Sequence, residues 1–495
     1  MKSIFEQLDE TVKEHGFVPD GFGFLNALKP GEILPLYPGE KEGLMNHAKG
    51  LAPAEEVDRA FNVIRENVKI NARLAVHNFD DNDLGFKVAD IRGQLLKKII
   101  DGIKEFDPHK LSTLAYSLVM FGEKIETVKL GLLILVLFDF ADDEVIRKHL
   151  ITIGMHEEFT GYVIANAKGW PPEIRNHVYY TYARKLKGWG KINAMEYIEP
   201  VNDEVRRWIL CHGCENDISY GMLAITAYEK SSLKKRLKRG GLDNEEMQGA
   251  RDIMRGLLME SGERSLAGIK EPEDFVDAYL KEQVSHSVGL EDLSNLLKIR
   301  SFFTAGEQGE DTEAALKLIE RILSLSDAEE MIRGGLAEHP DIAVSAASDC
   351  GIDISDDLLA LMMSDFDRYY IYAPYFMEEG RDLGDFVTIC EDKIETKAVN
   401  KEAGSTSADV WELDTVIGYL KDRPGMGSKI ILEGIVSENS ICREAAADVM
   451  KSWEGALGRN IKKIDSDLFH AVKKARKKET DEELKKAWDL VVDYK

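Results

Sequence analysis

Three tryptophans at a constant spacing give the strongest constraint on how this chain can fold. Trp170, Trp189 and Trp208 are separated by equal intervals (189 − 170 = 208 − 189 = 19 residues). This interval is about the length of one helix and its turn, so two intervals make a unit of roughly 40 residues. A repeated unit of this size is typical of a solenoid built from antiparallel helix pairs.

Helix breakers and apolar spacing support the same interpretation. Pro172 suits the first turn of a helix, and Gly188 suits a position just beyond its end. Between them, apolar residues recur every four positions from Ile174 to Leu186, which places them on one helix face. No long stretch alternates with period two. We therefore predict an all-α fold, a HEAT-like α-solenoid of stacked antiparallel helix pairs.

The repeat is not equally clear along the chain, which predicts three regions. Residues 1–106 show it weakly and are predicted to form an N-terminal helical cap, with helices at 54–77 and 85–106. Residues 107–304 form the predicted repeat array, including a buried central helix around 130–138. Residues 305–495 form a C-terminal helical repeat region, with a Gly-rich junction at 305–311 and a linker at 400–409.

A short pattern recurs at predicted helix starts within these regions. A capping or turn residue is followed by an aliphatic residue, expected in the core, and by an arginine expected to lie over the preceding turn. The four examples are Asp143-Glu144-Val145-Ile146-Arg147, Pro172-Glu173-Ile174-Arg175, Asp203-Glu204-Val205-Arg206 and Ser440-Ile441-Cys442-Arg443.

Composition limits the classes of partner. The chain has 64 Lys and Arg against 89 Asp and Glu, a net charge of −25. This charge repels phosphate backbones and anionic lipid, so we expect neither nucleic acid nor a membrane surface as a partner. Five cysteines make no disulfide framework, and the first residues contain no apolar core of signal-peptide length. We expect a cytoplasmic protein.

Cys211 and Cys214 are the most metal-like feature of the sequence. Two thiolates at this spacing can bind one zinc ion, but no second such pair follows, and Gly213 between them suits the end of a helix. His156-Glu157-Glu158-Phe159 lacks the second histidine of a zinc-protease helix. We predict no metal site and retain Cys211 and Cys214 as weak candidates.

The run Gly188-Trp189-Gly190-Lys191-Ile192-Asn193 superficially resembles a dinucleotide-binding turn. Such a turn follows a strand and carries a third glycine, whereas here a helix precedes it and Asn193 takes the third glycine's place. We interpret the run as a turn between two helices and predict no cofactor-binding residues.

Tyrosines are the remaining candidates for a binding surface. On a concave solenoid face they could form a partner-binding hot spot or an apolar pocket; alternatively, they pack between helices. The candidates are Tyr179, Tyr182, Tyr369, Tyr372 and Tyr375.

The run 187–192, together with 204–210 and 213–217, resembles a group of bacterial HEAT-like repeat proteins often labelled limonene hydroxylase. The resemblance covers about residues 107–300. It implies a HEAT-like fold and oxidation of a monoterpene, with NAD for possible further oxidation of the alcohol product. The matching residues form a packing motif, so the resemblance assigns no catalytic residue.

Two functions are therefore considered. Hydroxylation of an unactivated C–H bond needs a redox cofactor, and the sequence has no haem-thiolate, flavin or di-iron motif. We favour a scaffold that binds a protein partner along its concave surface. The alternative is a limonene hydroxylase-type oxidoreductase that takes a small apolar ligand and uses NAD with an oxygen-activating cofactor. The catalytic residues of such an enzyme are unknown.

Overall fold

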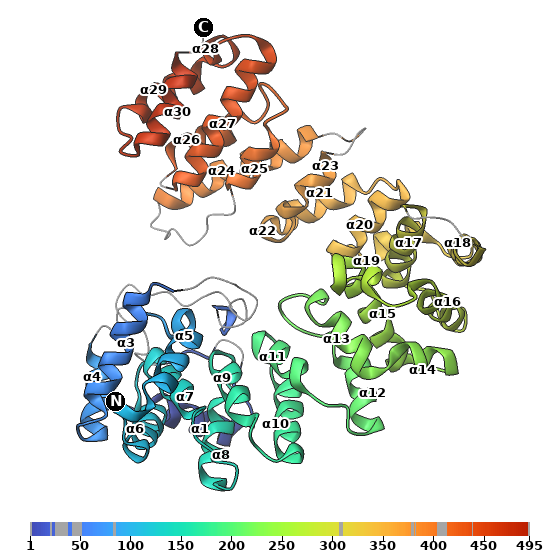
Figure 1. Ribbon diagram of the computed structural model, residues 1–495. Coiled ribbons are helices and arrows are strands. Elements are labelled where there is room, and N and C mark those ends of the chain that lie inside the picture. The colour runs from blue at the N-terminus through green and yellow to red at the C-terminus, as the bar shows by residue number, and fades with distance from the viewer. Residues whose placement is uncertain are drawn as a thin grey trace. The chain divides into compact units, whose positions relative to one another are not determined.

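The computed structural model in Figure 1 confirms the all-α class for the residues that it describes. These are residues 2–19, 22–24, 38–41, 52–82, 86–305, 310–377, 381, 383–402, 413–437 and 439–493, and every regular element among them is a helix. Most of the Gly-rich junction at 305–311 and of the linker predicted at 400–409 lies outside this part of the chain.

The chain divides into two compact units. The N-terminal unit comprises Met1–Ser287 and Lys298–Ile319, and the C-terminal unit comprises Val288–Leu297 and Glu320–Lys495. The residues of the predicted cap and most of the predicted array thus belong to one unit. The division falls within two helices, α17 (Leu290–Ala305) and α18 (Glu310–Ser324).

The other helices of the N-terminal unit are α1 (Ile4–His15), α3 (Ala54–Asn67), α4 (Ala72–Asp81), α5 (Val88–Asp101), α6 (Pro108–Phe121), α7 (Ile125–Leu135), α8 (Glu144–Ile153), α9 (Glu157–Ala167), α10 (Pro172–Lys185), α11 (Trp189–Tyr197), α12 (Asp203–His212), α13 (Gly221–Ser231), α14 (Leu233–Arg239), α15 (Asn244–Met259) and α16 (Pro272–Gln283), with short 3₁₀ turns at Ile103–Glu105, Gly262–Arg264 and Leu266–Gly268.

Those of the C-terminal unit are α19 (Ala328–Gly335), α20 (Pro340–Cys350), α21 (Ser355–Ser364), α22 (Phe366–Tyr369), α23 (Ala373–Phe376), α24 (Leu383–Glu402), α25 (Leu413–Tyr419), α26 (Ser428–Val436), α27 (Ser440–Leu457), α28 (Ile461–Ile464), α29 (Ser466–Arg476) and α30 (Glu482–Val492), with a 3₁₀ turn at Tyr370–Tyr372.

Several helix limits differ from those predicted. The helix expected at 54–77 is two helices, because Asn71 caps α4 by accepting a hydrogen bond from the N–H of Arg73. The helix expected at 85–106 is α5 followed by a 3₁₀ turn. By contrast, α10 begins at Pro172, as predicted.

Two rows of helices make up much of the N-terminal unit. The inner row consists of α5, α7, α9, α11, α13 and α15, each of which contacts the next. The outer row consists of α6, α8, α10 and α12, each packed against the inner helix that follows it in sequence. Within the outer row, Tyr182 of α10 donates a hydrogen bond to the carbonyl of Ile151, and the rings of Tyr180 and Trp208 join α10 to α12.

The inner row provides the core of this unit. Every residue of α7 except Glu126 is buried, which confirms the buried helix predicted around 130–138, although its limits are 125–135. In α11, the residues from Trp189 to Met195 are all buried. Helices that are apolar on all sides must be covered on all sides, so this row lies inside the unit.

The arginines of the recurring helix-start pattern mostly take the predicted position. Arg147, Arg175 and Arg443 each donate a hydrogen bond to a carbonyl six or seven residues earlier, in the preceding turn. The fourth, Arg206, pairs with Asp203 in its own helix. The aliphatic positions follow the prediction less well, since Val205 is buried but Val145 and Ile441 are 60% and 57% exposed.

Buried or half-buried carboxylates join helices that are distant in sequence. Each accepts hydrogen bonds from backbone N–H groups that have no partner within their own helix or turn. The connections run from Glu123 and Lys124 to Asp80, from Val88 to Glu126, from Lys187, Gly188 and Gly190 to Glu157, and from Gly241 and Leu242 to Glu282. These bonds fix the position of each helix start relative to another helix.

The C-terminal unit has its own core around two tryptophans. Trp453 of α27 and Trp488 of α30 are fully buried, and the indole N–H of Trp453 donates to the carbonyl of Leu420 at 2.8 Å. Arg443 and Glu479 form a nearly buried ion pair at 2.9 Å. The core therefore combines apolar packing with paired polar groups.

Gly249 of α15 allows a close approach to α12 and provides a test of this packing. A Cβ atom here would lie 2.7 Å from the carbonyl carbon of Leu210 and 2.8 Å from the Cα of Cys211. We expect Gly249→Ala to destabilise these helices by about 1–3 kcal/mol, because backbone atoms must move apart. The measurement is amide hydrogen exchange in α12 and α15.

Gly93 of α5 provides the matched control, because a Cβ at this helical position would meet nothing within 4 Å. Gly93→Ala should stabilise its helix by about 0.5–1 kcal/mol through helix propensity. Equal effects of the two substitutions would contradict the close packing of α12 and α15.

Candidate functional site

The candidate tyrosines lie mostly inside their units and do not form an exposed surface. Tyr179 and Tyr182 are buried in the N-terminal unit, and Tyr369 and Tyr375 are buried in the C-terminal unit. Their hydroxyl groups donate to carbonyls of neighbouring segments, those of Ile164, Ile151, Ala337 and Ile352.

Tyr372 is half-buried, and burial raises its pKa to about 12. Four of the five candidate tyrosines are therefore buried between helices. Their large rings fill gaps between helices, and their hydroxyl groups satisfy interior carbonyls. These positions correspond to the alternative considered for the tyrosines, packing between helices.

Cys211 and Cys214 are both buried and unpaired. Burial raises the pKa of the Cys211 thiol to about 12 and that of Cys214 well above its usual value. Thiol exchange requires the thiolate, which burial disfavours at both positions. Within the described ranges, no group of three or more His, Cys, Asp or Glu side chains is placed to hold a metal ion.

Backbone N–H groups of the turn between α10 and α11 bind the carboxylate of Glu157. Glu157, the first residue of α9, accepts hydrogen bonds from the N–H groups of Lys187, Gly188 and Gly190 at 2.9, 2.7 and 3.2 Å. A Cβ on Gly188 would collide with the Glu157 carboxylate, which explains the glycine. Burial raises the pKa of Glu157, and the three N–H groups counteract part of that rise.

This arrangement tests whether the turn fits a dinucleotide. A pyrophosphate would need the free N–H groups at the start of the helix. Here the Glu157 carboxylate already accepts three of them. The residues of this turn therefore do not fit NAD, and the turn is a connection between α10 and α11.

The neighbouring carboxylate, Glu158, belongs to a buried ion pair. Its side chain is 5% exposed, that of Lys129 on α7 is 3% exposed, and the ammonium nitrogen lies 2.5 Å from a carboxylate oxygen. The other oxygen accepts the N–H of Gly39 at 2.7 Å. Burial alone would raise the pKa of Glu158, but Lys129 and these hydrogen bonds bring it below its usual value.

The contact with Gly39 places a distant part of the chain on α9. We use the name N-terminal segment for the described residues 16–19, 22–24 and 38–41. The Phe24 ring lies 4.5 Å from that of His156, between centroids, and the backbone N–H of Gly39 reaches Glu158. Lys41 and Asp90 add an ion pair at 2.7 Å. The segment therefore packs on the first turns of α9 and α11.

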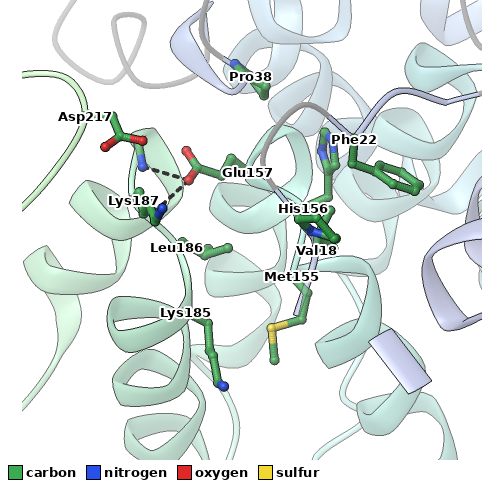
Figure 2. A pocket seen from close by; sticks show the side chains of 12 residues that line it. Val18, Phe22, Pro38, Met155, His156, Glu157, Lys185, Leu186, Lys187 and Asp217 are labelled. Carbon is green, nitrogen blue, oxygen red and sulfur yellow. Dashed lines mark hydrogen bonds between the residues drawn. The ribbon is translucent and has the colours of Figure 1, made fainter. Parts of the chain in front are cut away.

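A pocket of about 190 Å³ lies between this segment and a series of helix-to-helix turns (Figure 2). The turns are those between α8 and α9, between α10 and α11, and between α12 and α13. The lining residues are Val18, Pro19, Phe22 and Pro38 from the N-terminal segment, and Met155, His156, Glu157, Lys185, Leu186, Lys187, Gly188 and Asp217 from the turns.

The protonation state of His156, a polar residue that lines this pocket, follows from its surroundings. Burial lowers its pKa to about 4, so the imidazole is neutral at pH 7. Its Nδ1 accepts the N–H of Glu158 at 3.3 Å, which leaves the proton on Nε2. No acceptor for this Nε2–H occurs among the described residues.

Sequence reasoning noted His156, Glu157 and Glu158 only as an incomplete zinc motif. Both glutamates accept hydrogen bonds from backbone N–H groups. Their position at a helix start was a signal for this role, since acidic residues there often accept such bonds. The partners of these carboxylates could not be found in the sequence, because they lie between 29 and 119 residues away.

Comparisons with known proteins assign the chain to no family. No protein-family model matches the chain, and no curated protein or solved structure matches it. In the described part of the chain, no helix has both the length and the apolar character needed to cross a membrane. The function is therefore argued from the geometry of the two units.

Proposed function

We propose that the chain is a HEAT-like α-solenoid that acts in the cytoplasm as a scaffold for a basic protein partner. The observation that carries the proposal is an acidic row on the outer helices. The first turns of α8, α10 and α12 each expose acidic side chains, namely Glu144, Glu173, Asp203 and Glu204. Glu144 and Asp203 also form exposed ion pairs with Lys148 and Arg206 of their own helices, which a basic partner would have to compete with. The whole chain has a net charge of −25, and this acidic row adds a local negative surface, so both favour a partner of opposite charge.

Contacts between the helix pairs support a fixed spacing for this acidic row. Tyr182 connects α10 to α8, and the ring of Tyr180 connects α10 to Trp208 of α12. Glu157 connects α9 to the start of α11. A surface held in one arrangement loses little conformational entropy when a partner binds.

The partner surface was expected on a concave side, whereas the exposed acids that support this proposal lie on the outer row. From α7 to α11 the inner row is largely buried, and the N-terminal segment packs on the first turns of α9 and α11. The proposed partner therefore binds the outer row. The free cysteines support a reducing compartment such as the cytoplasm.

The proposal includes no oxidation step. A limonene hydroxylase-type reaction would use NAD and an oxygen-activating cofactor. The turn before α11 does not fit NAD, because Glu157 occupies its N–H groups.

The test begins with capture of partners by the full chain and then uses the purified partner alone. Calorimetry at two salt concentrations should show weaker binding at the higher one, because salt screens exposed charges. The outer-row variant Glu144→Gln/Glu173→Gln/Asp203→Asn should bind about tenfold more weakly, mainly through a slower association rate.

A control variant removes the same charge elsewhere. Asp356→Asn/Asp467→Asn/Glu482→Gln also neutralises three exposed first-turn acids, but in α21, α29 and α30 of the C-terminal unit. Its affinity should stay within about twofold of the native chain. Equal losses for the two variants, or no complex between purified components, would overturn the proposed outer-row surface.

A further inference from the structure

The pocket under the N-terminal segment combines apolar walls with one unused hydrogen-bond donor. Val18, Phe22, Met155 and Leu186 contribute apolar side chains. His156 is 7% exposed, it lines the same pocket, and its Nε2–H has no acceptor among the described residues. This nitrogen is not among the fully buried polar atoms without a partner, so it faces the open part of the pocket, where an acceptor on a ligand can take the place of water.

The charges of the pocket favour an uncharged ligand. Two carboxylates, Glu157 and Asp217, and two lysines, Lys185 and Lys187, contribute to the lining, so neither sign prevails. Glu157 already accepts three backbone N–H groups. A neutral His156 can donate a hydrogen bond but provides no positive charge for an anion.

The volume sets the size of the ligand. An apolar cavity of about 150 Å³ accommodates benzene, and sites for drug-sized molecules begin at about 300 Å³. At about 190 Å³ this pocket lies near the lower value. It suits one small ring with a single polar group.

We propose that this pocket binds a small, uncharged, apolar molecule with one hydrogen-bond acceptor, which receives the Nε2–H of His156. The ligand class includes small ketones, esters and ethers. The proposal does not depend on the partner-binding function, because the pocket is lined by helix-to-helix turns and the N-terminal segment, whereas the acidic residues of the outer row do not line it.

Three probes of similar shape test the proposal on the full chain. Acetophenone has an acceptor, isopropylbenzene has none, and benzoate carries a charge. Binding is followed through the methyl NMR signal of Met155, which lines the pocket and is assigned with a Met155→Leu variant. Acetophenone should bind about tenfold more tightly than isopropylbenzene, the typical effect of one hydrogen bond, and benzoate should bind most weakly.

Two variants separate the donor from the cavity. His156→Phe keeps a ring but removes Nε2–H, and should reduce acetophenone affinity to that of isopropylbenzene. Val18→Trp leaves His156 intact and fills the pocket, so both probes should lose binding. Val201→Trp, at a position that is 63% exposed and does not line the pocket, should change neither affinity.

Several outcomes would overturn the proposal. They are equal affinities of the native chain for acetophenone and isopropylbenzene, tightest binding of benzoate, unchanged binding in Val18→Trp, or no shift of the Met155 signal with any probe. Circular dichroism of each variant establishes that a lost signal does not come from unfolding.

Discussion

Replacing Lys129 by methionine is expected to lower the free energy of unfolding of the N-terminal unit by about 3–5 kcal/mol. Methionine has a similar length, so packing in α7 is largely kept. The change leaves the carboxylate of Glu158 buried without its ammonium partner, which lies 2.5 Å away in the native chain. The main cost is therefore an uncompensated charge in the interior.

The pH dependence of this effect has a defined sign. In the native chain the pKa of Glu158 is lowered, so its stabilising contribution is present above the unfolded pKa and is lost as the pH falls through the folded pKa. Without Lys129, burial dominates and raises the pKa of Glu158. The variant then binds a proton readily in acid, and its stability deficit should be larger at pH 7 than at pH 4.

A double variant separates charge from packing. Lys129→Met/Glu158→Gln removes both charges and keeps an acceptor for the N–H of Gly39. It should recover much of the stability lost in the single variant. Hydrogen exchange of α7 and α9 provides the measurement. A single variant as stable as the native chain at pH 7 would show that the pair is not buried as described.

Gly188→Ala should destabilise the α10–α11 connection by about 2–4 kcal/mol. A Cβ here would collide with the Glu157 carboxylate, with its carboxyl carbon 3.1 Å away, so the side chain must leave its three N–H partners. Each buried N–H without an acceptor costs about 1–3 kcal/mol, and partial access of water reduces the sum. The N–H groups of Lys187, Gly188 and Gly190 should then exchange much faster.

Gly169 provides the matched control for this substitution. It lies in the connection before α10, and a Cβ there would meet nothing within 4 Å. Gly169→Ala should change stability by less than about 1 kcal/mol. Because Gly188 and Glu157 act through the same hydrogen bonds, Gly188→Ala/Glu157→Ala should cost less than the sum of the single variants. Additive costs would indicate that the two residues act separately.

The sequence was sufficient for the class of fold and for many helices. Pro172 and the four-residue apolar spacing placed the start of α10 correctly, because both act within a few residues. The apolar run around Leu132 likewise indicated the buried helix α7. Helix limits were less reliable, since the helix expected at 54–77 is divided by the cap at Asn71.

The candidate site could not be predicted in the same way. The neutral state of His156 depends on its burial, which results from packing around the α8–α9 turn. Besides Lys129, Glu158 has Gly39 as a partner, in a segment without helical periodicity. The sequence also could not decide between the two roles considered for the tyrosines, because aromatic residues in a group are compatible with both a binding surface and a packed interior.

The contact between Gly39 and Glu158 also has a consequence for how the chain acquires its structure during synthesis. The two residues are 119 positions apart, and α1 is likewise joined to Gly122 through the N–H of Ile4. At about 5–20 residues per second, a ribosome needs roughly ten seconds to make the intervening chain. The first forty residues therefore leave the ribosome well before their docking sites exist. We expect the N-terminal unit to complete its folding late, after α9 and α11 have emerged.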